Sequence, residues 1–341
     1  MPTLPAPALN DFARAMFAAA GTPDDIADYV ARTLITANLM GHDSHGVIRV
    51  IWYLNQVRDG ELIVDAQPEI RKQHGAVAVI DCRRGFGQIG ARMGAQVACD
   101  LAGDYGIGCV SITNINHVGR LGEYAGWLAG QGRVAIVLSA FSWTSVTPYG
   151  GREGILGTNP MAWAVPTRDD PLVLDFATSI VAAGKIQVAL DEDREVPAGW
   201  LLDRDGLPTQ NPSNFRNGGV LLPFGTYKGY GLNLMMELIP TLLGGLAPAT
   251  SPEFEKGNPT LILALNIEAF TDMERFVRLA DELRARVKQV PPAQGFDEVL
   301  LPGEPEARSM AQRQRDGIPV AEKTWAALTE LATEYGVTVP V

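Results

Sequence analysis

Residues 81–90 read Asp-Cys-Arg-Arg-Gly-Phe-Gly-Gln-Ile-Gly. This stretch decides whether the sequence can form a Rossmann-type dinucleotide site. The last six positions match the G-x-G-x-x-G fingerprint of Rossmann folds. In a Rossmann fold the first glycine directly ends a strand, so that the turn presents backbone N–H groups to a pyrophosphate. Here Asp81 to Arg84 separate the apolar run at 77–80 from Gly85, and no carboxylate follows the next apolar run. We therefore interpret residues 85–90 as a tight loop before a helix and expect no Rossmann-type site.

On both sides of this loop the sequence alternates between strand-like and helix-like patterns. Apolar runs rich in β-branched residues predict strands at 77–80, 107–113, 134–138, 172–176 and 261–265. A four-residue apolar repeat, Ile89, Met93, Val97 and Leu101, predicts a helix directly after the loop. A shorter helix is expected at 121–129. The alternation indicates an α/β or α+β body.

The two ends of the chain have helical patterns. Thr22 is expected to cap a helix that starts at Pro23 and runs towards Met40. An apolar face within 273–287 predicts a charged helix, and a last amphipathic helix is expected at 325–335, in an otherwise polar tail. Glycine and proline cluster at 197–223, which makes this segment the best candidate for a long functional loop.

Composition limits the possible partners of the chain. With 341 residues, 46% of them hydrophobic, the chain is long enough for two domains with well-buried cores. Its formal net charge of −11 argues against nucleic-acid binding, so an anionic substrate needs a local cationic site. The sequence has no long unbroken apolar run and no signal-peptide pattern, so we expect no membrane association. Three cysteines without metal or redox spacing favour a reducing compartment, the cytoplasm.

One candidate site surrounds His45, which lies three residues after His42 and four before Arg49. If a helix starts near Ser44, His45 and Arg49 share one of its faces. An arginine there binds a carboxylate bidentately while the histidine handles a proton beside it. The alternative is an ordinary capped helix start in which Arg49 pairs with a surface acid.

A second candidate is His117, which follows a predicted strand and precedes a predicted helix. Loops after strands are where α/β proteins place reactive groups, and histidine suits acid–base chemistry on a hydroxyl or carbonyl. The alternative is a histidine that only satisfies loop backbone groups.

Two further segments have residues that suit phosphate binding. Residues 175–179 end a predicted strand with hydroxyl side chains that suit donation to phosphate or ribose oxygens. Lys228 stands before Gly229 and opens a helix, so a charge lies where the backbone can approach a ligand closely. Either pattern also occurs without function, as a strand-end cap or as a chance pairing of lysine and glycine.

Seven short motifs, taken in order, give a more specific signal. They are Gly-His-Asp-Ser-His-Gly-Val-Ile-Arg (41–49), Asn-His-Val-Gly (116–119), Pro-Tyr-Gly-Gly (148–151), Gly-Thr-Asn-Pro (157–160), Leu-Asp-Phe-Ala-Thr-Ser (174–179), Lys-Gly-Tyr-Gly-Leu (228–232) and Leu-Pro-Gly-Glu (301–304). Together they resemble the second type of malate/L-lactate dehydrogenase family, which is unrelated to the Rossmann enzymes of those names. The resemblance runs over nearly the whole chain.

This resemblance implies an α/β (α+β) non-Rossmann fold with a larger domain on a mostly antiparallel mixed sheet. It implies a helical domain from residues 1–70 joined by 305–341, an NAD(P)-binding domain at 71–304, and a homodimer. Family members bind NAD(H) or NADP(H) and interconvert small 2-oxo and 2-hydroxy acids, or reduce cyclic imino acids. Known branches act on malate, lactate, sulfolactate, ureidoglycolate, diketogulonate and piperideine-carboxylate. We expect NAD as cofactor, with NADP as the alternative.

Carried over position by position, the resemblance assigns roles to single residues. His117 and His45 match the proton carriers of different branches, and Ser44 and Arg49 match residues that meet the substrate carboxylate. The positions expected to line the cofactor are Gly119, Ser142, Asp175, Phe176, Ala177, Thr178, Ser179, Lys228, Gly229, Gly303 and Glu304. One departure is the bulky Phe-Ser-Trp-Thr at 141–144.

Two other functions stay open on the residues alone. A metal-dependent hydrolase would use His42, Asp43, His45 and His117 as ligands, since histidines and an aspartate can hold zinc. A non-catalytic protein that keeps this scaffold would fail to bind nicotinamide.

Overall fold

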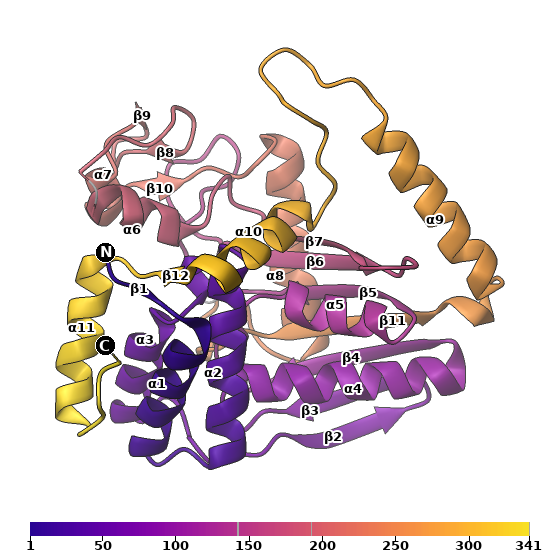
Figure 1. The fold of residues 1–341 in the computed structure, drawn as a ribbon, viewed down its shortest axis with the longest axis horizontal. Coiled ribbons are helices and arrows are strands. Elements are labelled where there is room, and N and C mark those ends of the chain that lie inside the picture. Colours follow the sequence, from indigo (N-terminus) through magenta and orange to yellow (C-terminus); the bar gives the residue numbers. More distant parts are fainter. Residues whose placement is uncertain (142, 192, 341) are drawn as a thin grey trace.

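The fold centres on one mixed seven-stranded sheet (Figure 1). We describe it from a computed structural model that covers residues 1–141, 143–191 and 193–340. The strands in spatial order are β2 (Glu69–His74), β3 (Val77–Asp81), β4 (Ile107–Thr113), β11 (Thr260–Asn266), β5 (Arg133–Ser139), β6 (Pro160–Val165) and β7 (Leu172–Ala177). Among the described residues β3 and β4 pair in parallel, and the other neighbours pair antiparallel. The expected mostly antiparallel mixed sheet is confirmed.

Helices cover both faces of this sheet. In β5, Ala135 and Val137 face a core built with α4 (Gly87–Tyr105) and α5 (Gly122–Gly130). The alternate residues Ile136 and Leu138 join a smaller cluster with Met236 of α8 (Tyr227–Leu243). Because successive strand residues point to opposite faces, α8 lies across the sheet from α4 and α5.

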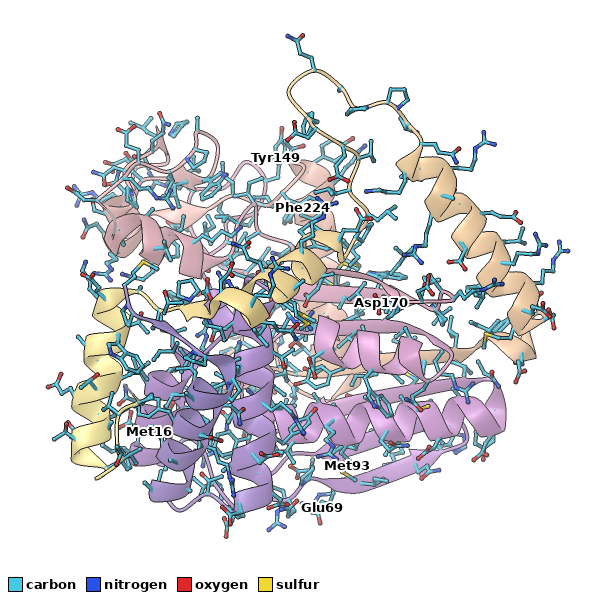
Figure 2. The ribbon with its side chains drawn as sticks, viewed as in Figure 1. Met16, Glu69, Met93, Tyr149, Asp170 and Phe224 are labelled. Carbon is cyan, nitrogen blue, oxygen red and sulfur yellow. The ribbon has the colours of Figure 1, made fainter. Side chains whose placement is uncertain are left out.

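The two ends of the chain build a separate helical core. It joins α1 (Ala6–Ala19), α2 (Asp24–Leu39), α3 (Arg49–Arg58) and α11 (Glu322–Glu334). Strand β1 (Thr3–Leu4) pairs with β12 (Ile318–Pro319), which ties the ends together, and α10 (Glu304–Asp316) packs along α2. Figure 2 shows Met16 among these end helices and Met93 on α4, each at its own core. The division into domains at residues 70 and 305 stays a prediction.

The segment expected to be a long loop is instead a small folded unit, so that expectation was wrong. It holds β8 (Leu201–Leu202), β9 (Pro208–Thr209), α7 (Ser213–Arg216) and β10 (Val220–Leu221), and the strands form a sheet in the order β10-β8-β9. With α6 (Ala183–Asp191) they enclose a third apolar cluster. Strands of two residues are too short to show a periodic pattern in sequence.

Two expectations for the N-terminal segment also fail. Helix α2 begins at Asp24 with Pro23 at its cap position, and the buried Thr22 hydroxyl has no hydrogen-bond partner among the described residues. No helix starts at Ser44, because residues 43–45 form the single 3₁₀ turn η1 (Asp43–His45) and α3 starts at Arg49.

Helix α9 (Met273–Lys288) lies at the edge of the molecule (Figure 1), where Arg284 donates to Thr167 and Lys288 to Glu304. The helix was expected, but its apolar side is only partly covered: all of α9 is described, and none of its residues is buried. Within the described ranges, every helix is too short or too polar to span a bilayer.

Candidate active site

The structure brings the two candidate histidines together from distant parts of the chain. His45 ends the turn η1, and His117 lies in the loop between β4 and α5. Their rings stack with centroids 5.5 Å apart and planes inclined by 25°. His117 is 7% exposed, whereas His45 keeps partial access to solvent. This imidazole pair is the centre of the candidate site.

Arg49 lies beside the imidazole pair, held by contacts other than the expected helix face. Its Nε donates to the carbonyl oxygen of Ser44 at 2.6 Å, and its guanidinium carbon lies 4.9 Å from the ring centre of Trp52. The described residues offer no hydrogen-bond partner to its two Nη groups. A planar guanidinium fixed at Nε and on one face therefore presents its remaining N–H groups to a carboxylate.

The charge of Arg49 and burial set the protonation of both imidazoles. Burial, and then Arg49, lower the pKa of His45 to about 3. The same two causes, followed by His45 itself, lower the pKa of His117 well below 6.5. Both rings are therefore neutral at pH 7 in the free protein. A bound anion would offset the charge of Arg49 and make it easier to protonate either ring.

Two aromatic residues of α3 complete the surroundings of His117, and sequence reasoning missed both. The Tyr53 hydroxyl lies 2.7 Å from His117 Nδ1 and accepts a hydrogen bond from Gln88 Nε2 at 2.8 Å. The Trp52 ring lies 5.2 Å from that of His117. Once α3 is known to start at Arg49, positions three and four residues further on fall on the same helix face. That spacing was the available signal.

His42 and Asp43 are held by other partners, so the ligand set of a metal-dependent hydrolase is not assembled. Both Asp43 carboxylate oxygens pair with Arg313, at 2.6 and 2.9 Å, and His42 Nε2 lies 3.3 Å from Glu306. In the described part of the chain, no three His, Cys, Asp or Glu side chains converge as metal ligands would. The pairs instead fasten the turn η1 to α10.

Ser44 contacts its neighbours through both its hydroxyl and its Cβ. Its Oγ lies 3.0 Å from His45 Nδ1. The backbone of α6 passes so close that a Cβ added at Gly184 would stand 2.5 Å from the Ser44 Cβ. The expected substrate-binding residues Ser44 and Arg49 are therefore both next to the imidazole pair.

The segment at the end of β7 is partly committed to structural contacts. Asp175 Oδ2 accepts from the Gly122 backbone N–H at 2.7 Å, at the start of α5. Burial raises the pKa of Asp175, against the opposing pull of Arg120. The Thr178 hydroxyl donates to two backbone carbonyls, and the Ser179 hydroxyl donates to that of Val181. These two hydroxyls donate within the protein, and their donation to phosphate or ribose oxygens stays a prediction.

The two segments expected to line the cofactor nevertheless lie side by side. The Phe224 backbone N–H donates to the Thr178 carbonyl at 3.1 Å, and the ring of Phe176 packs edge-on against Phe224 at 5.4 Å. Phe224 precedes α8, whose second residue, Lys228, is exposed and has no ion-pair partner among the described residues. Gly229 is required there, since a Cβ would stand 1.7 Å from the Phe224 carbonyl oxygen.

The remaining cofactor candidates are placed as follows. Gly303 has a φ of 90° at the start of α10 and lies beside the backbone of Val173 in β7. Glu304 pairs with Lys288 at 2.8 Å and accepts from the Leu301 N–H. Gly119, with a φ of 75°, follows His117 closely in the same loop, and Ala177 is the last residue of β7. Ser142 lies outside the described residues.

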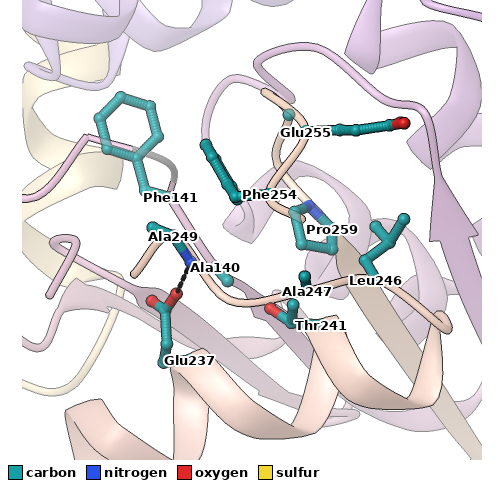
Figure 3. A pocket seen from close by; sticks show the side chains of 11 residues that line it. Ala140, Phe141, Glu237, Thr241, Leu246, Ala247, Ala249, Phe254, Glu255 and Pro259 are labelled. Atoms are coloured by element: carbon teal, nitrogen blue, oxygen red, sulfur yellow. Dashed lines mark hydrogen bonds between the residues drawn. The ribbon is translucent and has the colours of Figure 1, made fainter. Parts of the chain in front are cut away.

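A hollow beside Phe141, seen in Figure 3, is a further feature near the site. The Phe141 ring, which lines the hollow, lies 6.4 Å from the ring of His117. Glu237, another lining residue, accepts a hydrogen bond from the Ala249 N–H. The cavity volume of the hollow is about 10 Å³. Because small-molecule pockets run from roughly 300 to 1,000 Å³, this hollow alone does not hold a dinucleotide.

Comparison with known proteins agrees with this geometry. The profile of the malate/L-lactate dehydrogenase family matches residues 4–329. The chain belongs to this family. It is 35% identical to a malate dehydrogenase of Pyrococcus abyssi (93% of this chain, 90% of the relative), and 34% identical to hydroxycarboxylate dehydrogenase B of Escherichia coli K12 (96% and 93%). The solved sulfolactate dehydrogenase of Methanocaldococcus jannaschii superposes with a TM-score of 0.89 at 32% identity (99% and 98%).

As a member of the malate/L-lactate dehydrogenase family, the chain is a nicotinamide-dependent oxidoreductase of 2-hydroxy acids. The rejection of the glycine motif as a Rossmann site agrees with the mixed, mostly antiparallel sheet of this chain.

Proposed function

We propose that this enzyme reduces a small 2-oxo acid to the 2-hydroxy acid, and carries out the reverse reaction, at the imidazole pair. The observation that carries the proposal is the meeting of His45, His117 and Arg49 around one point. Arg49 binds the carboxylate of the acid through its free Nη groups. The oxygen on the neighbouring carbon then lies towards the imidazoles, one of which supplies the proton in reduction and accepts it in oxidation.

The residues around β7 fit a nicotinamide dinucleotide. The first N–H groups of a helix have no partner within the helix and attract anions. The unpaired cation of Lys228 stands at this end of α8, next to the end of β7, and suits the diphosphate. Gly119 and Gly303 are the other glycines expected to line the cofactor, and both have a positive φ. A bound reduced nicotinamide supplies the hydride.

Charge links substrate binding to the protonation of the two imidazoles. The protein as a whole has a net charge of −11 and repels an anion, but Arg49 is a local cation with two unsatisfied groups. When the carboxylate neutralises Arg49, the cause that ranks second in depressing both histidine pKa values is removed. Substrate binding therefore prepares an imidazole for proton transfer to the developing alkoxide.

The decisive experiment follows the oxidation of NADH and NADPH by the purified protein with a panel of acids. The panel should contain pyruvate, oxaloacetate, sulfopyruvate, longer 2-oxo acids and cyclic imino acids. We propose that at least one 2-oxo acid is reduced, and that NADH is preferred. If no panel member is reduced and neither cofactor's fluorescence changes on adding protein, the proposal is wrong and a non-catalytic role gains support.

We also propose that the working form is a homodimer in the cytoplasm. The apolar residues Leu279 and Leu283 of α9 are 42% and 66% exposed, and Leu242 and Leu243 at the end of α8 are 54% and 62% exposed. Apolar patches of this kind mark protein interfaces, and a second copy of the chain is the occupant we propose. The three cysteines are free, in keeping with a reducing compartment.

A further inference from the structure

The glycine motif at 85–90 contains a buried polar residue, Gln88, that is linked to His117 through the hydroxyl of Tyr53. Helix α4 starts at Gly87, where an added Cβ would stand 2.3 Å from the carbonyl oxygens of both Asn116 and His117. Only glycine lets the helix approach the backbone of the His117 loop this closely. The next residue, Gln88, is 0% exposed and reaches Tyr53. The motif therefore joins α4 to the catalytic loop.

The hydrogen bonds from Gln88 to His117 have a direction. Gln88 Nε2 can only donate, and it donates to the Tyr53 hydroxyl oxygen at 2.8 Å. The single hydrogen of that hydroxyl is then left for His117 Nδ1, 2.7 Å away. His117 Nδ1 must accept, so the one proton of the neutral ring lies on Nε2, the nitrogen away from Tyr53.

The orientation of the Gln88 amide is supported by its other atom. Gln88 Oε1 is buried without a hydrogen-bond partner among the described residues. The opposite orientation would leave the amide N–H groups without an acceptor, and buried unpaired N–H groups are rarer than buried carbonyl oxygens that lack a donor. Tyr53 keeps its proton, since burial raises its pKa to about 12.

We propose that Gln88 is a positioning residue that fixes His117 as the tautomer protonated on Nε2, so that His117 donates a hydrogen bond to the substrate oxygen. The inference rests on the proposed function and divides the roles within the imidazole pair. A neutral imidazole N–H polarises a carbonyl without first being protonated. The donor is therefore in place before hydride arrives.

The tautomer is measured directly in the free protein by ¹⁵N NMR with labelled histidine. The chain has only four histidines, and the His117→Gln variant identifies the resonances of His117. We expect the chemical shifts of a protonated Nε2 and an unprotonated Nδ1 at neutral pH. A protonated Nδ1, or an average of the two tautomers, would overturn the proposal.

A pair of variants tests the role of Gln88. Gln88→Met keeps the length of the side chain and removes its donor, which frees the Tyr53 hydroxyl to accept from His117. We expect averaged ¹⁵N shifts for His117 and a kcat lowered by at least about tenfold, since a wrong histidine tautomer lowers turnover by up to about 10⁴-fold. KM for the acid should change little. Gln96→Met, at an exposed position of the same helix, should behave like the unaltered enzyme.

The outcomes separate the two proposals. If Gln88→Met leaves both kcat and the His117 shifts unchanged, Gln88 only fills space and the inference is wrong. If Gln88→Met does not fold, the shifts of the unaltered protein still decide the tautomer. If no 2-oxo acid is reduced by the unaltered protein, the proposed function fails, while the NMR result stands by itself.

Discussion

At the scale of single residues, Arg49 has two effects on the site. It offers its Nη groups to an anion, and its charge depresses the pKa of both imidazoles. The stack on Trp52 and the bond to the Ser44 carbonyl hold the guanidinium plane in one orientation. A lysine ammonium is a point charge, so it has neither a planar group to stack on Trp52 nor two parallel N–H donors for a carboxylate.

We therefore predict that Arg49→Lys mainly raises KM for the acid. One lost hydrogen bond to a charged group is worth about 1.5–3 kcal/mol, which corresponds to a KM increase of roughly tenfold to a hundredfold. Steady-state kinetics with the preferred 2-oxo acid measure this effect. Arg58→Lys, at the exposed far end of α3, is the matched control and should leave KM unchanged. An unaltered KM in Arg49→Lys would refute the proposal that Arg49 binds the carboxylate of the substrate.

The depressed pKa of His45 predicts a pH-dependent stability. The pKa is about 3 in the folded protein, and about 6.5 in the unfolded chain. The folded state binds fewer protons between these values, so the stabilisation is complete above about pH 6.5 and is lost as the pH falls below it. The slope is at most about 1.4 kcal/mol per pH unit for this histidine.

Urea unfolding at about pH 7 and about pH 5.5 tests this dependence. His45→Gln should lose less stability over this interval than the unaltered protein. His74→Gln, at the exposed end of β2, should lose as much as the unaltered protein does. Equal losses in all three proteins would show that His45 does not carry the effect.

The sequence allowed part of this residue-level description. Ser44, His45 and Arg49 are close in the chain, and a short motif places them together. His117 was found because it follows a strand. The Tyr53 and Gln88 contacts join residues 35 and 64 positions apart, and depend on how α3 and α4 meet. The packing of α3 against α4 leaves no local pattern in a single sequence.

At the scale of elements, strands with continuous apolar runs were predicted well. The predicted strand at 107–113 matches β4 in full, and 134–138 lies within β5. Strand β6 was missed, since it starts with Pro160 and has Trp163 exposed. The sequence pattern did not predict helix α10 either, because the helix has no buried residue and most of its residues are polar. It is held by ion pairs to His42 and Asp43 and by the partly buried Met310, which packs against the helical core.

The contact between α4 and the His117 loop gives a prediction at this scale. In Gly87→Ala the new Cβ meets two backbone oxygens at 2.3 Å, and backbone cannot swing aside as a side chain can. We expect a loss of about 1–3 kcal/mol in the free energy of unfolding. Turnover should fall as well, because the start of α4 has to move away from the His117 loop and displaces Gln88.

The control for this prediction lies on the same helix. Gly103 is exposed near the end of α4, and a Cβ there meets only the Arg133 side chain, at 3.5 Å. Gly103→Ala should therefore raise the free energy of unfolding by about 0.5–1 kcal/mol, as expected for a helix-interior glycine. Urea unfolding and the NAD(P)H assay measure both variants. If Gly87→Ala is as stable and active as Gly103→Ala, the close approach of α4 is not needed.

At the scale of the whole molecule, the outlying helix α9 determines the last prediction. Its apolar residues Leu279 and Leu283 stay exposed in the described chain, although the sequence has the apolar periodicity of a helix that packs against another surface. A second copy of this chain would provide that surface. We expect light scattering to give twice the chain mass of 36.6 kDa.

Substitutions on the two sides of α9 test where the second copy binds. The double variant Leu279→Lys and Leu283→Lys places two charges on the apolar side, and burying an unpaired charge costs several kcal/mol. It should shift the protein to monomers at concentrations where the unaltered protein is dimeric. Ala285→Lys adds a charge on the opposite side of the same helix and should leave the dimer intact. A dimer that survives the double variant would place the interface elsewhere, because Leu279 and Leu283 could not then be buried in it.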